Sequence, residues 1–308
     1  MGPRVSRLDR QSFLGKHSDA VLNATTIGLV GLGGGGSHGV QQFAHIGIGG
    51  YVPVDPDTID ETNTNRLIGG TLADVAEALP KVKIAERMIR GLHPGASIFP
   101  VKDSWHAATD QLKTCDVIVG AVDSFIEREQ LERFARRHLI PYIDIGMDVH
   151  DLGKDGFLVG GQVILSSPDM PCMRCCGFIT DERLTREAEQ YGAAGGRPQV
   201  VWPNGVLAST AVGLAVQIVS PWFPRPPTFT YLEYDGNRGT LTRSGRVELL
   251  KDHVCRHHPA EETGDPLFDI RKHVEAVEAR IRATERAAAP APGSGRFTRW
   301  LRRQFGKG

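Results

Sequence analysis

The sequence predicts an α/β fold in which a doubly wound, mostly parallel sheet is covered by helices on both faces. Three observations predict it. Strand-like and helical patterns alternate over the first half of the chain, a glycine-rich turn follows the first strand, and 308 residues with 40% hydrophobic residues can form a large core. Such alternation is typical of parallel strands joined by helical crossovers.

The elements are expected in this order. Short apolar and β-branched runs predict strands at TIGLVGL, GYVPVD, SIFPV, CDVIVGAV and IPYIDIG. Helical periodicity predicts helices over 37–47, 71–91, 104–112 and 124–138. After Asp148 we expect a strand pair in GFLVGGQVILSS, a polar loop over 176–203, an apolar helix over 204–219, and strands at FTYLEYD and GTLTR. This second half is expected to extend the same sheet.

The composition argues against several classes of protein. Lys plus Arg and Asp plus Glu number 36 each, so no overall field favours nucleic acid or an anionic membrane. The first ten residues are charged and lack the apolar core of a secretory signal, and the apolar stretch GVLASTAVGLAV is shorter than a bilayer span. We therefore expect a cytoplasmic protein that binds neither nucleic acid nor membranes.

The last part of the chain differs in composition. Residues 264–288 predict a charged helix, AAAPAPGSG predicts a linker, and RFTRWLRRQFGKG predicts a short basic amphipathic segment. The expected organisation is an N-terminal arm over 1–24, a main domain over 25–262, and a helix, linker and basic tail over 263–308. A solvated tail and a docking element for a partner protein both remain open for the basic segment.

The glycine-rich turn predicts a nucleotide site. Gly31, Gly33 and Gly36 stand at the spacing G-x-G-x-x-G, which lets the backbone and a helix N-terminus approach a phosphate. Alone, this motif favours an NAD(P)-dependent oxidoreductase in which Asp55 bonds a ribose hydroxyl. A non-catalytic nucleotide-binding scaffold is a further alternative.

Polar residues beyond the turn favour a triphosphate instead. They are Asp55, Asp57, Asn63 and Arg66 in DPDTIDETNTNRL, and Lys81 in PKVKIAERMI. A dinucleotide gains nothing from these additional groups, whereas a reaction that expels pyrophosphate needs cations and donors around the leaving group. Asp123 follows the carboxyl end of a predicted strand, where a carboxylate can hold Mg²⁺ against the phosphates.

This ordered set resembles the ubiquitin-activating-enzyme-like adenylyltransferase superfamily of ThiF, MoeB and HesA type. The resemblance covers roughly residues 5 to 258 and rests on Gly31–Gly36, Asp55, Asp57, Asn63, Arg66, Lys81, Asp123 and Arg128. It implies a Rossmann-like fold that uses ATP and Mg²⁺ to adenylate the C-terminal carboxylate of a ubiquitin-like or sulfur-carrier protein. It also implies a homodimer, and it leaves open a conjugating enzyme as a further partner.

The resemblance also implies roles for single residues. Asp55 would hold the ribose, Asp123 the magnesium, and the phosphates would be held by Asn63, Arg66 and Lys81. RLDRQSFLG matches a segment whose arginine reaches the partner subunit's ATP site, so Arg10 is expected to act in trans. Ser124 departs from the Asn that usually follows the aspartate. Three alternatives remain open: a turn-capping role for Asp57, a solvated position for Arg128, and Lys83 in place of Lys81 as the phosphate ligand.

The cysteines predict a metal site rather than disulfides. Cys172 and Cys175 in CMRC supply half of a tetrahedral zinc site, because two thiolates at that spacing can converge on one ion. The resembling family completes it with a second C-x-x-C. This chain has CRHH instead, so Cys255 and His258 are expected to complete a Cys₃His zinc knuckle in the C-terminal extension. His257 is the near alternative, and buried thiols without metal are another.

One thiol is missing where the resemblance suggests it. Some members of the family pass the activated carboxylate to a cysteine, and Val201 stands at that position here. Cys115 lies in a strand-like run and is expected in the core. Cys176, in the loop that follows the expected zinc ligands, is the only spare thiol in a position to meet substrate, and we expect it to be a bystander. The reaction is therefore expected to stop at the adenylate.

Overall fold

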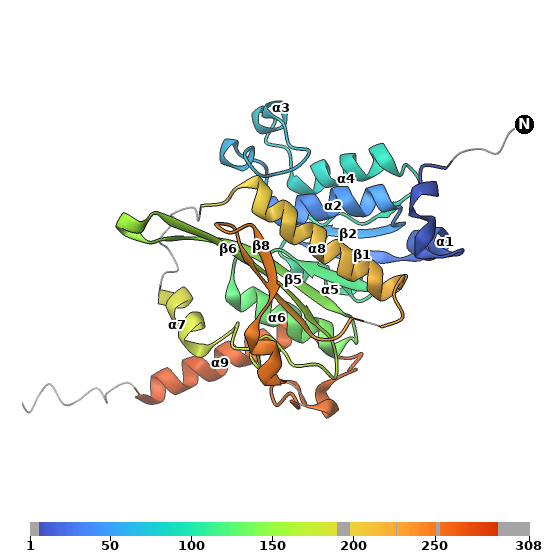
Figure 1. The fold of residues 1–308 in the computed structure, drawn as a ribbon. Coiled ribbons are helices and arrows are strands. Elements are labelled where there is room, and N and C mark those ends of the chain that lie inside the picture. The colour runs from blue at the N-terminus through green and yellow to red at the C-terminus, as the bar shows by residue number, and fades with distance from the viewer. Residues whose placement is uncertain (1–5, 190–197, 226, 251–252, 289–308) are drawn as a thin grey trace, which may run out of the picture. The chain divides into compact units, whose positions relative to one another are not determined.

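The computed structural model describes residues 6–189, 198–225, 227–250 and 253–288 (Figure 1). The strands are β1 Thr26–Val30, β2 Gly50–Val54, β3 Ser97–Ile98, β4 Val117–Gly120, β5 Tyr142–Asp151, β6 Phe157–Ser166, β7 Thr230–Asp235 and β8 Thr240–Arg243. The α-helices are α1 Ser18–Ala24, α2 Gly34–Ile46, α3 Leu72–Ala76, α4 Lys81–Leu92, α5 Thr109–Leu112, α6 Phe125–Arg137, α7 Asp181–Glu189, α8 Val201–Val219 and α9 Ile270–Ala288. Short 3-10 helices are η1 Asp9–Leu14, η2 Glu61–Asn63, η3 Trp105–Ala108, η4 Gly153–Asp155, η5 Gly245–Leu250 and η6 Ala260–Glu262.

All of these strands form one eight-stranded sheet in the order β3-β2-β1-β4-β5-β6-β7-β8. The strands from β3 to β5 pair in parallel, and β6, β7 and β8 continue the sheet with antiparallel pairs. The predicted doubly wound α/β fold is thus confirmed, with the second half of the chain extending the same sheet. The strand order reverses between β1 and β4, which is where open α/β sheets bind ligands.

Helices cover both faces of the sheet. α2, α4 and α8 pack together with β1, β2, β5 and β6 over one face. Neighbouring residues of a strand point to opposite faces, so Val117 and Val119 of β4 join this core while Ile118 points the other way. On that other side a Cβ on Gly28 would meet Leu112 and Ile118 at 2.9 and 3.1 Å, so α5 packs closely against β1.

α8 is longer than expected. It begins at Val201 rather than at 204, because Pro203 is tolerated in the first turn of a helix. With 19 apolar-rich residues it is long enough by composition to cross a membrane. Half of an 18-residue stretch of this helix is buried, and the helix packs against α2, β5 and β6, as the core helix of a globular protein does.

Three expected elements differ from the structure. Pro80 and the positive φ of Ala78 divide 71–91 into α3 and α4, since proline breaks the preceding helical bonds. GFLVGGQVILSS is one strand, β6, which pairs with β5 along ten residues. Its glycines do not turn the chain, because the reversal occurs at Gly153 and Gly156, whose φ angles are positive. The expected polar loop over 176–203 contains α7.

The chain divides into two compact units, Met1–Phe268 and Asp269–Gly308. The first unit contains the sheet. Within the second, α9 is the charged helix that the sequence predicts. The basic segment over 296–308 lies outside the described residues.

Candidate nucleotide site and metal centre

A cavity of about 260 Å³ opens at the carboxyl ends of β1, β2 and β4, beside the point where the strand order reverses. The glycine turn, the start of α4 and the start of α6 form its walls. Among the residues that line it are Gly31, Gly33, Gly34, Asp55, Asp57, Arg66, Lys81, Asp123, Glu127, Arg128 and Gln199. Most of the residues predicted for a nucleotide site therefore share one cavity.

The glycine turn requires glycine at two of its three predicted positions. Gly31 has a φ of +85°, and a Cβ there would lie 2.6 Å from the carbonyl oxygen of Ala121. A Cβ on Gly36 would lie 1.8 Å from the carbonyl oxygen of Gly31, so α2 and the turn touch through bare backbone. Gly33 begins α2 and has open space at its Cβ position. The open space and the free amides of α2 suit an anion.

Asp55 lies just past the end of β2 and is 5% exposed. Its Oδ2 accepts the Leu32 N–H at 2.7 Å, and its Oδ1 accepts the Asp57 N–H at 2.9 Å. Burial raises the pKa of Asp55, and the Lys81 ammonium and these two bonds partly oppose the rise. The carboxylate is thereby fixed at the floor of the cavity, against the glycine turn.

Lys81 and Arg66 bring positive charge to the cavity. Lys81 is the first residue of α4, and its Nζ lies 2.7 Å from Asp57 Oδ2 and 3.6 Å from Asp55 Oδ1. Arg66 donates from one guanidinium nitrogen to the Thr62 carbonyl at 2.6 Å. Asp57 therefore does more than cap a turn, since it holds the lysine. Lys83 is more exposed and pairs with Glu86, which favours Lys81 as the residue that faces the ligand.

Asn63 lies in the turn before Arg66 and is 7% exposed. It forms a capping box with Asp60, in which the Asn63 N–H donates to Asp60 Oδ1 at 3.1 Å and the Asp60 N–H donates to Asn63 Oδ1 at 3.4 Å. The Asn63 side-chain amide also donates to Asp60 Oδ1, at 3.1 Å. Asn63 is not among the described residues that line the cavity. The asparagine shapes the turn that carries Arg66.

Arg10 lies far from the cavity of its own chain. Its 3-10 helix η1 is attached to the C-terminal end of α2, where Arg7 donates to the His45 carbonyl at 2.8 Å and Gln11 to the Ile46 carbonyl at 3.0 Å. The glycine turn is at the opposite end of this 13-residue helix, about 20 Å away at 1.5 Å per residue. The structure thus does not bring Arg10 to the predicted site within one chain.

Asp123 follows β4 and lines the cavity, as predicted from its place after a strand. Its Oδ1 accepts a hydrogen bond from Gln199 Nε2 at 3.2 Å, and the Gln199 carbonyl accepts one from Asn65 at 2.9 Å. Sequence reasoning missed Gln199 because it falls in a stretch without a motif. Ser124, which replaces the usual asparagine, is the N-cap of α6 and accepts the Glu127 N–H.

Arg128 is buried rather than solvated. One of its guanidinium nitrogens donates to both oxygens of Asp144 at 2.6 Å and to the Ile145 carbonyl at 3.1 Å. Asp144 is fully buried and also accepts from Tyr142 at 3.1 Å and Gln162 at 3.1 Å. Because Arg128 lines the cavity as well, this network joins the nucleotide site to β5 and β6.

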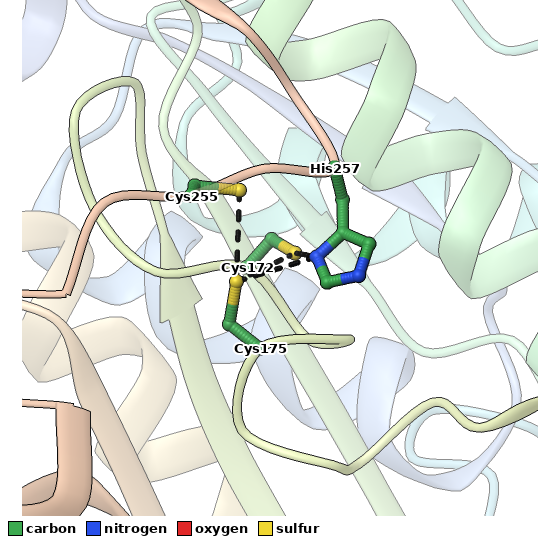
Figure 2. Close-up of side chains that lie close together, drawn as sticks. All are labelled: Cys172, Cys175, Cys255 and His257. Atoms are coloured by element: carbon green, nitrogen blue, oxygen red, sulfur yellow. Dashed lines mark hydrogen bonds between the residues drawn. The ribbon is translucent and has the colours of Figure 1, made fainter.

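The three predicted cysteines converge with a histidine (Figure 2). The Sγ atoms of Cys172 and Cys255 each lie 3.6 Å from that of Cys175, and His257 Nδ1 lies 3.5 and 3.4 Å from Cys172 and Cys175. A tetrahedral zinc ion with ordinary bond lengths needs separations of about 3.8 Å between sulfurs and about 3.6 Å between sulfur and nitrogen. The four side chains therefore fit zinc, and they would hold it between two segments far apart in sequence.

His257, the alternative to the predicted His258, is the histidine that lies with all three cysteines. His258 is 7% exposed and lies near Glu132 and Cys172, with its Nε2 3.9 Å from Glu132 Oε2. Burial, together with the nearby Arg136 and Arg133, lowers the pKa of His258 to about 3. Residues 256–258 form a bend, and this bend brings His257 to Cys172 and Cys175. His253 Nε2 also approaches Cys175 Sγ, at 3.2 Å, a contact that the sequence did not suggest.

The remaining thiols lie outside this cluster. Cys176 is 3% exposed and donates to the Met173 carbonyl, and burial raises its pKa to about 12. Burial likewise raises the pKa of Cys115 to about 12, and this residue lies in the core as expected. Such thiols are protonated at neutral pH and are poor nucleophiles.

Curated relatives match parts of the chain. The SAMP-activating enzyme E1 of Haloferax volcanii is 30% identical over 177 residues, which are 56% of this chain and 60% of that protein. The sulfur carrier protein adenylyltransferase of Thermus thermophilus is 29% identical over 129 residues, or 40% and 47%. The tRNA threonylcarbamoyladenosine dehydratase of Bacillus subtilis is 27% identical over 133 residues, or 42% and 52%. The matched regions thus span less than two thirds of these relatives.

Solved structures share the fold at lower identity. The crystal structure of E. coli MccB with ATP has a TM-score of 0.63 and 17% identity, and the match covers 78% of this chain and 71% of that one. The crystal structure of PaaA has a TM-score of 0.60 and 17% identity, with 79% and 74% covered. The ThiF family profile matches residues 6–256. That match takes in the glycine turn, the whole sheet and Cys255, and the chain belongs to the ThiF family.

Proposed function

We propose that this chain adenylates the C-terminal carboxylate of a ubiquitin-like or sulfur-carrier protein, using ATP and Mg²⁺ and releasing pyrophosphate. The charge distribution of the cavity carries the proposal. A glycine turn that suits phosphate continues into Lys81 and Arg66, and Asp123 lines the same cavity. This is the set of charges that a triphosphate and its metal ion need.

Asp55 is the residue that we assign to the ribose. Each of its oxygens already accepts one backbone N–H, and a carboxylate oxygen can accept a second hydrogen bond. A ribose hydroxyl can therefore donate to Asp55 without displacing the turn. Asp123 would hold Mg²⁺ against the phosphates, where the ion would neutralise part of their charge.

An oxygen of the partner's carboxylate attacks the α-phosphorus of ATP, and the bond from that phosphorus to the bridging oxygen breaks, so pyrophosphate leaves with that oxygen. Lys81 and Arg66 stabilise the negative charge that grows on the leaving group. Lys81 can turn to the phosphates because Asp57, its present partner, has a side chain that is 62% exposed and is easily hydrated.

A second cavity supports a polypeptide substrate. It has a volume of about 530 Å³ and shares Asp123, Arg128, Gly146 and Met147 with the nucleotide cavity. From there it continues over β5, β6 and β7, along Gln162, Tyr231 and Glu233. An extended C-terminal segment lying there would end beside the nucleotide. The names of the Haloferax and Thermus relatives support the same substrate class.

The assembly that we propose is a cytoplasmic homodimer in which Arg10 enters the nucleotide cavity of the partner subunit. The place of η1, at the far end of α2, supports action in trans over action within one chain. Zinc held by Cys172, Cys175, Cys255 and His257 would be structural. A conjugating enzyme remains a candidate as a second protein partner.

ATP–pyrophosphate exchange tests the proposal. The purified chain is incubated with ATP, Mg²⁺, labelled pyrophosphate and a sulfur-carrier protein ending in Gly-Gly; the same carrier without its last glycine is the control. We expect exchange that requires the intact carrier. In Asp123→Ala the exchange rate should fall, because the activation barrier should rise by several kcal/mol. Asp123→Ala with activity within about threefold of the parent, roughly 0.7 kcal/mol, would remove Asp123 from the magnesium role.

The same assay separates the rival functions. A non-catalytic scaffold predicts ATP binding without exchange. An NAD(P)-dependent oxidoreductase predicts binding of a nicotinamide nucleotide and leaves Lys81, Arg66 and Asp123 without a task. The dehydratase relatives have names that refer to tRNA, so exchange stimulated by tRNA and not by the carrier would move the substrate to that class.

A further inference from the structure

α6 is the element that contacts both the nucleotide cavity and the cysteine cluster. It starts directly after Asp123 and Ser124, and its later turns face the loop that carries Cys172 and Cys175. Both oxygens of Glu132 accept the Met173 N–H, at 3.0 and 3.2 Å. Arg136, one turn farther on, donates to the Ser167 and Met170 carbonyls just before that loop.

Arg174, between the two cysteines, connects this loop to α7. Its Nε donates to Glu129 of α6, and one of its terminal nitrogens donates to Asp181 at 2.7 Å. Asp181 is the first residue of α7. Farther along α7, the Arg183 guanidinium lies 5.4 Å from the centre of the Phe125 ring of α6. The first turn of α7 is thus attached to α6 twice, through the cysteine loop at Asp181 and through a cation–π contact at Arg183.

Glu187 ends this chain of contacts at the start of α6. Its Oε1 accepts the Phe125 N–H at 3.1 Å, and its Oε2 accepts the Ile126 N–H at 3.1 Å and the Ser124 hydroxyl at 3.2 Å. The first amides of a helix have no partner within the helix, and the positive end of the helix dipole favours a carboxylate there. One side chain of α7 thus fixes the three residues that follow Asp123.

We propose that Glu187 is a positioning residue for Asp123, and that the cysteine loop keeps Glu187 in place through Arg174. The inference rests on the proposed function, which gives Asp123 its task with Mg²⁺. Glu187 touches neither ATP nor the metal ion in this scheme. It acts by restricting the backbone at residues 124–126, and its charge adds to the negative potential that attracts Mg²⁺.

The expected signature is a changed Mg²⁺ requirement rather than a lost activity. In Glu187→Gln the amide oxygen can accept one backbone N–H, but its NH₂ group faces the other and cannot accept it. Loss of one such bond corresponds to about a fivefold change in an equilibrium constant. The Mg²⁺ concentration for half-maximal binding of ATP should therefore rise by about fivefold, while the rate at saturating Mg²⁺ changes little.

Calorimetric titration of a non-hydrolysable ATP analogue at several Mg²⁺ concentrations measures this directly. Glu187→Asp keeps the charge and should recover part of the affinity. Glu182→Gln, a neutralised and exposed glutamate on the same helix, is the matched control and should behave as the parent. Zinc content, measured by elemental analysis, should be the same in all four proteins, so that loss of metal does not explain the shift.

The link to the cysteine loop is tested by a double-mutant cycle. Arg174→Gln should raise the Mg²⁺ requirement in the parent background and should add little to Glu187→Gln, because both changes break one chain of contacts. Asp181→Asn replaces Arg174→Gln if that variant does not fold. A Mg²⁺ requirement in Glu187→Gln equal to the parent's, or additive effects in the cycle, would overturn the inference and leave the proposed function standing. A parent that binds no nucleotide would overturn the proposed function itself.

Discussion

The buried pair of Arg128 and Asp144 gives a prediction whose size follows from the structure. Asp144 is fully buried and Arg128 is 6% exposed. Replacing Arg128 by methionine leaves a buried carboxylate with hydrogen bonds from Tyr142 and Gln162 and no cation. Removing one partner of a buried ion pair costs about 3–5 kcal/mol, so Arg128→Met should reduce the free energy of unfolding by that amount.

A second substitution shows whether the uncompensated charge is the cause. Asp144→Asn keeps an oxygen that can accept from Tyr142, and in combination with Arg128→Met it leaves no charge buried. The double variant should therefore recover at least about 2 kcal/mol relative to the sum of the single variants. Arg238→Met removes the cation of an exposed pair and should cost no more than about 1 kcal/mol.

Urea unfolding followed by tryptophan fluorescence is a suitable measurement, since Trp105 is 2% exposed and reports loss of the core. If the destabilisation of the double variant equals the sum of the two single variants to within about 0.5 kcal/mol, the two side chains do not depend on each other. A cost below about 1 kcal/mol for Arg128→Met would show that water reaches Asp144. Either result would refute the reasoning.

Three further predictions concern the site. Arg10→Ala and Asp123→Ala chains, each inactive alone, should regain exchange when mixed under conditions of subunit exchange; no recovery would mean that Arg10 does not act in trans. The parent should contain about one zinc per chain. His257→Ala should lower this zinc content, and also the melting temperature in the presence of a chelator, while His258→Ala keeps the metal. The reverse result would make His258 the fourth ligand. Because burial raises the pKa of Cys176 to about 12, its thiol stays protonated below that pH. Cys176→Ser should therefore keep exchange, and the parent should form no reducible covalent band with its carrier on a non-reducing gel. A band that disappears in Cys176→Ser would make this thiol an acyl carrier.

Local patterns predicted the architecture well. Alternating strand and helix patterns predicted the sheet, and the order of charged residues after the glycine turn predicted a site whose Asp55, Arg66, Lys81 and Asp123 line one cavity. These features depend on residues close together in sequence, or on the rule that carboxyl ends of parallel strands meet at one edge. Half of the cysteine cluster was predicted from the spacing of Cys172 and Cys175, because thiolates separated by two residues can share an ion, and the other half from the family resemblance.

The features that the sequence did not predict depend on contacts between distant segments. The capping box between Asn63 and Asp60, and the bond from the Asn63 side-chain amide to Asp60 Oδ1, were not predicted. The choice between His257 and His258 depends on which of two adjacent side chains lies with all three cysteines, and periodicity does not decide this in an irregular segment. Glu187 stands in a stretch read as a loop, so its contact with α6, about sixty residues earlier in the chain, had no local signal.

The position of η1 has a consequence for how the activity responds to dilution. A single chain holds Arg10 near one end of α2 and the glycine turn at the other. If Arg10 works only on a nucleotide bound by a partner, every complete site is made of two chains, and the number of complete sites follows the law of mass action. Below the dissociation constant of the pair, the rate per chain would fall in proportion to protein concentration. The amount of this protein in the cell would then set the rate of carrier activation more steeply than linearly, with no regulatory ligand required.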